Sequence, residues 1–174
     1  MYKDAANLFA KYNKIVNETM DGIIKTLSPQ EWDRDLGGYF KSVRGVCSHV
    51  YICDFNWLRR FRNYRDFSTP KAPFFDKPYS FSELLFEEAG EYLSKRPELD
   101  DKIIAFTSEL NDSDMEGILK YTDSEGKSYE NVLGGCVMHF LNHETHHRGV
   151  ISLYLEMLGR GNDFCSLINV FKDR

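Results

Sequence analysis

The sequence predicts an all-α protein, a four-helix bundle with a long crossover loop and a small hairpin or loop before the last helix. Apolar residues recur at steps of three and four through most of the chain, which is the spacing of one helix face. No long segment alternates apolar and polar residues as strands do. A proline-containing segment divides the helical pattern, as a crossover between helices would. These three observations favour a helical bundle.

The first half of the chain supplies two of the helices. The first is predicted over residues 8–27, where the apolar residues form one stripe. Ser28 and Pro29 are then predicted as the N-cap and first residue of a short helical turn that carries Trp32. The second helix is predicted over residues 41–63 and is rich in aromatic residues.

A crossover loop and a third helix follow. The loop is predicted over residues 68–79, which contain three prolines. Its adjacent Phe74 and Phe75 should pack onto the body, because a loop rarely leaves two phenylalanines in water. The third helix is expected to begin at residues 80–82. Pro97 should kink or interrupt it, because proline lacks the backbone N–H that a helix interior needs.

The last part of the chain is expected to form a hairpin or loop and then the fourth helix. Residues 117–131 hold two short polar-alternating arms on either side of a turn at residues 123–126. The fourth helix is predicted over residues 129–158. Gly159 and Gly161 are expected to end it. The following tail has enough apolar residues to dock on the bundle: Phe164, Leu167, Ile168 and Phe171.

Size and charge limit the possible classes of protein. The 174 residues are predicted to form a single domain, residues 1–174. Of these residues 42% are hydrophobic and 28% are charged, and this composition excludes wholesale disorder. The formal net charge is −5, and the longest basic stretch is Arg59, Arg60 and Arg62. A nucleic-acid-binding protein normally presents a basic face, so no nucleic-acid partner is expected.

No membrane or export signal is visible in the sequence. No stretch approaches the roughly 18 apolar residues of a membrane-spanning helix. The N-terminal residues lack the apolar core of a signal peptide, so a cytoplasmic location is expected. The four cysteines form no CxxC pair and are expected to be reduced thiols. They are Cys47, Cys53, Cys136 and Cys165.

The histidines carry the chemical signal. Four of the five lie within nine positions of the predicted last helix: His139, His143, His146 and His147. Residues four apart share a helix face, so His143 and His147 can present two imidazoles to one point. His139 and His143 have the same spacing. The apolar stripe of this helix distinguishes the pairs, because it includes His147 and has His143 at its margin.

A third ligand is needed, because two histidines rarely hold a divalent ion tightly. His49, on the second predicted helix, is the remaining histidine that can approach from another element. The metal hypothesis is therefore a site of His49, His143 and His147. A hydrogen-bonded core histidine is the competing interpretation for His49. For His139 and His146 a surface or supporting role is favoured.

The same segment also matches HExxH, the zinc-protease pattern in which the glutamate is a general base. The longer protease signature fails, because Val150 and Leu153 occupy its glycine and histidine positions. A protease is therefore disfavoured. Glu144 is instead expected to pair with a cation such as Arg148, four residues later on the same helix.

These motifs resemble a known family. NHETHHRG in the last helix, GVCSHVYICDFNWL in the second helix and YTDSEGKSYEN between them look like the DinB-like (damage-inducible, YfiT-related) metalloenzyme family. The resemblance implies a four-helix bundle with one divalent ion, zinc or nickel, held by His49, His143 and His147. One departure is Val150, where many members have glutamine.

Function is implied in the same way. Characterised relatives include thiol S-transferases, which join a low-molecular-weight thiol such as bacillithiol or mycothiol to an electrophile, and the family commonly forms homodimers. The resemblance therefore implies a thiol S-transferase-like enzyme with a small-molecule thiol and an electrophile as partners. Trp57, Phe140, Tyr154 or the loop phenylalanines, Phe74 and Phe75, can line its pocket, although core packing is the favoured role for each. A metal-dependent hydrolase and a non-catalytic metal-binding stress-response protein are the alternatives.

Overall fold

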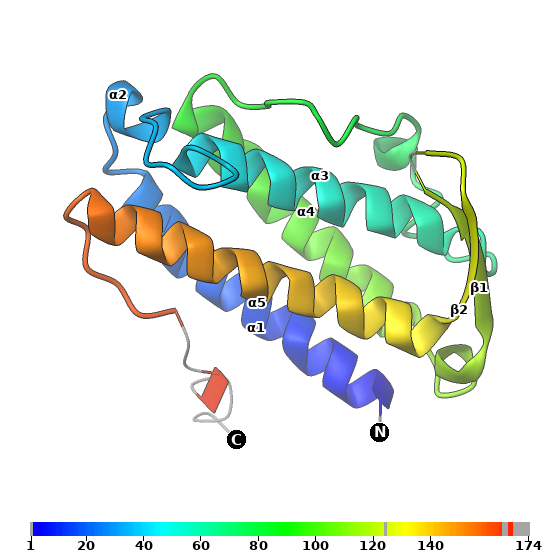
Figure 1. Ribbon diagram of the computed structural model, residues 1–174. Helices are drawn as coiled ribbons and strands as arrows, with labels where there is room; N and C mark the ends of the chain where they lie inside the picture. The colour runs from blue at the N-terminus through cyan, green and yellow to red at the C-terminus, as the bar shows by residue number, and fades with distance from the viewer. Residues whose placement is uncertain (1, 124, 165–166, 169–174) are drawn as a thin grey trace.

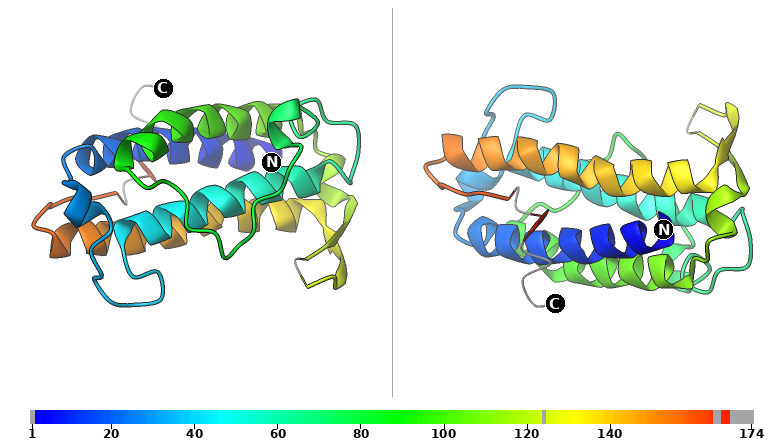
Figure 2. Two further views of the ribbon diagram at one scale, coloured as in Figure 1. Left: turned by 90° about the horizontal axis from the view of Figure 1, so that it is seen from above. Right: turned by 90° about the horizontal axis from the view of Figure 1, so that it is seen from below.

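The computed structural model describes residues 2–123, 125–164 and 167–168, and this part of the chain is mainly helical. Its long helices are α1 (Tyr2–Ile24), α3 (Val43–Phe61), α4 (Ala89–Glu109) and α5 (Leu133–Met157). Helix α1 packs against α4 and α5, and α3 packs against the same two helices (Figures 1 and 2). This arrangement confirms the predicted helical bundle.

Shorter elements connect the long helices. Helix α2 (Pro29–Trp32) has the predicted N-cap, and its Ser28 and Glu31 side chains form a reciprocal capping box. The 3-10 turns η1 (Pro73–Phe75) and η2 (Asp114–Glu116) lie in the loops. Strands β1 (Ile118–Thr122) and β2 (Ser128–Val132) form the predicted antiparallel hairpin, in which Tyr121 faces Tyr129.

The third long helix begins later than the sequence predicts. Helix α4 starts at Ala89 and not at residues 80–82. The Ser48 hydroxyl, on α3, donates to the Leu85 carbonyl (3.1 Å) and accepts from the Leu85 amide (3.1 Å). These bonds satisfy the loop backbone without a helical turn, and Phe86 is buried beside them at a positive φ of 56°. A contact with another helix therefore overrides the local helical signal.

Two other boundaries also differ from the predictions. Pro97 was predicted to kink or interrupt this helix; it lies inside α4, which continues to Glu109, so it does not interrupt the helix. Helix α5 begins at Leu133 and not at residue 129, because residues 128–132 pair with β1. Its end is as expected, with Gly159 at a φ of 77°.

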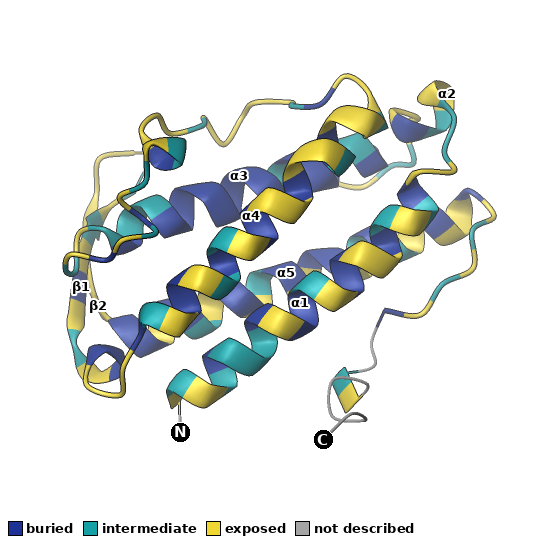
Figure 3. Cartoon of the chain, turned by 180° about the vertical axis from the view of Figure 1, so that it is seen from behind, coloured by how far each residue is buried: buried dark blue, intermediate teal, exposed yellow. Residues whose placement is uncertain are grey.

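The core occupies the space between the four long helices. Helix α3 is buried along most of its length, whereas α1 and α4 each present an exposed outer face (Figure 3). The crossover loop covers α3, and its Phe75 is fully buried, as predicted. In the tail, Phe164 is buried and Ile168 is exposed, while Phe171 lies outside the described residues. No described helix is both long enough and apolar enough to cross a membrane.

Candidate metal centre

Four potential ligands from two helices converge between α3 and α5. His49 and Cys53 are four residues apart on α3, and His143 and His147 are four residues apart on α5. Each pair therefore shares a helix face, and the packing of α3 on α5 brings the two faces together. We call these four side chains the His/Cys cluster.

The nitrogen atoms of the three imidazoles lie close enough to share one ion. The Nε2 atom of His143 is 3.3 Å from Nε2 of His49 and 2.9 Å from Nε2 of His147. The potential ligand atoms of His49, Cys53 and His143 all lie within 4.8 Å of one another. Two nitrogens bound tetrahedrally to zinc at roughly 2.0–2.1 Å would be about 3.3 Å apart. The donor set and its spacing fit a divalent metal ion.

Burial keeps the imidazoles uncharged. It lowers the pKa of His143 to about 3 and that of His147 to about 4, and the neighbouring imidazoles act in the same direction. Burial also lowers the pKa of His49. Neutral imidazole is the form that binds a metal, so the rings are available as ligands at neutral pH.

Ring packing holds the imidazoles in place. The Phe40 ring lies 4.7 Å from the His49 ring and 5.1 Å from the His147 ring, measured between centroids. The Nδ1 atoms of His143 and His147 are buried and have no hydrogen-bond partner among the described residues. Many metal-binding histidines are oriented by such a hydrogen bond. Here the Phe40 ring contacts His49 and His147, and the His143 ring packs against both of these imidazoles.

Comparison with known proteins identifies the family of this chain. Residues 1–167 match the DinB family. The chain belongs to the DinB family. It is also similar to the protein DinB of Bacillus subtilis (strain 168), with 25% identity over 173 residues, covering 90% of this chain and 87% of that protein.

Cys53 is the member of the His/Cys cluster that the sequence analysis missed. Its Sγ atom lies 3.5 Å from Nε2 of His49. Burial raises the pKa of the thiol to about 12, and the Asp54 carboxylate adds to this, while the Arg60 guanidinium acts in the opposite direction. The available signal was its position four residues after His49, which places both side chains on one face of α3.

The two remaining histidines of α5 lie where the sequence analysis expected them. His139 and His146 are exposed, whereas His147 is 6% exposed and His143 is half-buried. The His139 ring is 5.5 Å from the Trp57 ring and 6.3 Å from the His143 ring. His139 therefore lies one helical turn from the cluster, at the edge of a cavity of about 490 Å³ that Trp57 and Cys136 also line.

Glu144 does not have the partner predicted from the sequence. Its Oε2 atom lies 3.4 Å from Nη2 of Arg96, on α4, and accepts a hydrogen bond from Asn17, on α1 (3.2 Å). No ion pair between Glu144 and Arg148 occurs among the described residues, because Arg148 bonds instead to Asn13 (3.1 Å). The glutamate of the HExxH-like segment is thus engaged in the core, which argues against the protease interpretation.

Arg96 is the centre of a buried charge network that joins all four long helices. Its guanidinium donates to Asp54 on α3 (2.6 Å) and to Asp100 on α4 (2.9 Å), and it also faces Glu144 on α5. Asn17 on α1 donates to Asp100 and Glu144. Burial raises the pKa of Asp54 and of Glu144, although Arg96 opposes this effect. Each carboxylate of this network has a hydrogen-bond donor or cation beside one of its oxygens, while Asp54 Oδ1 and Glu144 Oε1 are buried without a hydrogen-bond partner among the described residues.

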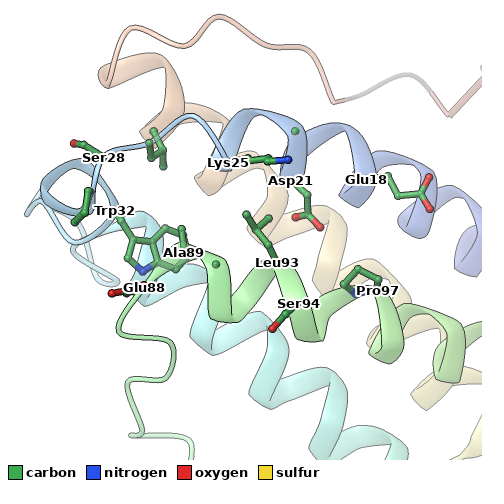
Figure 4. Close-up of a pocket in the computed structure, with 14 residues that line it drawn as sticks. Glu18, Asp21, Lys25, Ser28, Trp32, Glu88, Ala89, Leu93, Ser94 and Pro97 are labelled. Carbon is green, nitrogen blue, oxygen red and sulfur yellow. The ribbon is translucent and has the colours of Figure 1, made fainter.

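A larger cavity, of about 750 Å³, lies away from the His/Cys cluster, between α1 and α4. Figure 4 shows Asp21, Lys25, Trp32 and Leu93 among its lining residues. Burial raises the pKa of Asp21 to about 7. None of the four cluster residues lines this cavity. The potential metal ligands, rather than this larger cavity, therefore define the candidate site.

Proposed function

We propose that this DinB-family chain is a divalent-metal-dependent enzyme of the thiol S-transferase kind. The single observation that supports a metal is the convergence of three uncharged imidazoles, with Nε2 of His143 at 3.3 Å from His49 and 2.9 Å from His147. Three nitrogen ligands leave at least one coordination position for a substrate. That open position distinguishes a catalytic site from a closed structural one.

The proposed ligands are His49, His143 and His147, and the Cys53 thiol lies beside them without being counted as a ligand. Three imidazoles and a solvent ligand suit either zinc or nickel. When bound, such an ion would stabilise the thiolate form of a substrate thiol, which is the nucleophilic form. Family membership supports this chemistry, because the resemblance of the motifs points to thiol transfer.

The side chains of the chain itself would position the substrate. Phe40 covers His49 and His147 on one side, so it restricts access of water to the cluster. On the other side the cavity of about 490 Å³ begins one helical turn away, at His139 and Trp57. Its aromatic wall suits the apolar part of an electrophile. Phe140, a second pocket candidate from the sequence, is fully buried in the core.

Two alternatives use the same ligands. A hydrolase would act on its substrate with metal-bound water, and a non-catalytic protein would use the ion only to clamp α3 to α5. Consumption of an electrophile that requires both metal and thiol would separate the transferase from both. The predicted partners, a small thiol, an electrophile and a second copy of the chain, remain predictions.

The first experiment is elemental mass spectrometry on untagged protein. We expect about one divalent ion per chain, lost in His49→Ala, His143→Ala and His147→Ala. His139→Ala is the matched control, because it removes an exposed histidine of the same helix and should keep the ion. Cys53→Ser should weaken binding less than His143→Ala does. Wild-type protein that takes up neither zinc nor nickel would refute the proposal.

The second step is an activity assay on the metal-loaded protein. Loss of a model electrophile such as monochlorobimane should require both metal and thiol, and His143→Ala should be inactive. Turnover of an ester without thiol would favour the hydrolase. If metal raises the thermal midpoint but no substrate is consumed, the clamp alternative is favoured.

A further inference from the structure

A basic cavity lies in this acidic protein, on the last turn of α3. The cavity has a volume of about 400 Å³, and the arginines of the basic stretch noted in the sequence, Arg59, Arg60 and Arg62, all line it. Arg62 is committed to the crossover loop, since it donates to the carbonyls of Pro70 and Phe75. Arg59 and Arg60 make no such bonds within the part of the chain that the structure describes.

These two arginines differ from others in the fold. Arg44, Arg65 and Arg160 each pair with a carboxylate at 3.0 Å or less. No described carboxylate lies within ion-pair distance of Arg59 or Arg60, and the buried Nε of Arg59 has no hydrogen-bond partner there. Burial lowers the pKa of Arg59, and the charge of Arg62 lowers it further, whereas Asp76 opposes them. Positive charge is therefore concentrated here without a full counter-charge.

One carboxylate does line the cavity, but it has other partners. Asp123 accepts hydrogen bonds from the Tyr129 hydroxyl (2.9 Å) and from the amides of Glu125 and Lys127. These bonds hold the pKa of Asp123 below its usual range. Asp123 shapes the hairpin turn and does not neutralise the arginines.

Aromatic rings fix the position of Arg60. Its guanidinium carbon lies 4.8 Å from the Trp57 ring centroid, 5.4 Å from that of Tyr121 and 5.6 Å from that of Phe81. Stacking on rings leaves the N–H edges of a guanidinium free for a bidentate bond to an oxyanion. Trp57 and Tyr121 also line the cavity of about 490 Å³, so Arg60 lies at the junction of the two cavities.

This junction lies on the same side of α3 and α5 as the His/Cys cluster. Cys53, Trp57 and Arg60 follow one another along α3, so Arg60 lies roughly 10 Å beyond Cys53 along the helix axis. On α5, His139 bridges the gap, with its ring in contact with both Trp57 and His143.

We propose that Arg59 and Arg60 form an anion subsite that binds the carboxylate or phosphate group of a small ligand, whose other end reaches the His/Cys cluster. The apolar middle of the ligand would lie along Trp57 and Tyr121. The second half of this proposal rests on the proposed function, whereas anion binding by the arginines does not. The substrate class is thus an oxyanion-bearing molecule long enough to span the roughly two helical turns of α3 between Arg60 and Cys53.

The test uses three probes of similar size: phenyl phosphate, benzoate and the neutral benzyl alcohol. Each is titrated into chelator-treated full-length protein and followed by tryptophan fluorescence, to which Trp57 contributes, and by calorimetry. At least one anion should bind more tightly than the alcohol, and salt should weaken its binding. The stronger of the two anions identifies carboxylate or phosphate as the natural group.

Variants assign that binding to the arginines. Arg60→Gln should weaken anion binding by about tenfold or more, and Arg60→Lys should restore part of it. Arg34→Gln, which removes an exposed arginine elsewhere, should have no effect. Equal affinity for the alcohol and the anions, or equal losses in Arg60→Gln and Arg34→Gln, would overturn the proposal. If Arg60→Gln does not fold, Arg59→Gln takes its place in the test. Unchanged affinity of Arg59→Gln for the anionic probes would then count against the subsite.

The connection to the cluster is tested separately on the metal-loaded protein. Among ω-mercaptocarboxylates, 8-mercaptooctanoate, whose extended length matches the spacing, should bind more tightly than mercaptoacetate, and Arg60→Gln should remove that preference. His143→Ala should lose the preference but keep the binding of the anionic probes. A protein that binds no metal but still binds these probes would refute the metal proposal alone. Metal uptake without anion binding would refute the subsite alone.

Discussion

Helix α5 has two polar faces that are built in opposite ways. His143 and His147 face α3, where their Nε2 atoms converge and their buried Nδ1 atoms lack described partners. Glu144, one residue later than His143, faces α4 and α1, where Arg96 and Asn17 bind it. Adjacent residues on one helix thus serve different purposes. Contacts with Arg96 and Asn17 join Glu144 to the neighbouring helices, whereas the converging Nε2 atoms of His143 and His147 are placed to share a ligand.

The largest effect on stability is expected from removing the cation that contacts Glu144. Arg96→Met should reduce the free energy of unfolding by about 3–5 kcal/mol, because it leaves the buried Asp54, Asp100 and Glu144 without their cation. Urea denaturation measures this loss. Arg34→Met, at an exposed position, is the control and should change stability little. A loss below about 1 kcal/mol in Arg96→Met would mean that the network is not a principal stabilising element.

The pH dependence of stability should differ between the two faces. In metal-free protein the pKa of His143 is about 3, below the ordinary value of about 6.5 in the unfolded chain. The unfolded state therefore binds more protons in this range, so the contribution of His143 is fully present above about pH 6.5 and is lost as the pH falls toward 3. The pKa of Glu144 is raised, so this carboxyl contributes with the opposite sign.

The contribution of the histidine face can be isolated by comparing the wild type with His143→Leu. Urea denaturation at a series of pH values from 7 to 4 should show that stability falls more steeply on acidification in the wild type than in the variant. His139→Leu, at an exposed position of the same helix, should retain most of the wild-type slope, because burial is the main cause of the lowered pKa of His143 and His139 is a minor one. Parallel curves for the wild type and His143→Leu would show that His143 titrates normally in the folded chain.

The smallest effect on stability should come from a substitution in the histidine face itself. At pH 7, His143→Leu in metal-free protein should leave the free energy of unfolding within about 1 kcal/mol of the wild type or increase it, because it replaces a half-buried polar ring whose Nδ1 atom lacks a hydrogen-bond partner among the described residues. The same variant should bind no metal. A large loss of stability would indicate that the ring is structural, and the contrast between the two faces would not hold.

Local periodicity made most of the architecture predictable. The helical bundle, the capped turn at Ser28, the hairpin and the glycine that ends α5 all depend on residues close together in the sequence. The same holds for the pairing of His143 with His147, because one helical turn fixes that spacing. The start of α4 could not be predicted in this way, since Ser48, a residue of another helix, holds the backbone before it.

The tertiary structure alone decided which side chains meet across helices. The sequence placed His49 beside the α5 pair as a hypothesis, but the convergence of their Nε2 atoms and the inclusion of Cys53 depend on how α3 packs on α5. The partner of Glu144 was predicted wrongly for the same reason: spacing along one helix offered Arg148, whereas Arg96 approaches from α4. Helical periodicity determines the direction in which a side chain projects. The packing of the helices determines what it meets there.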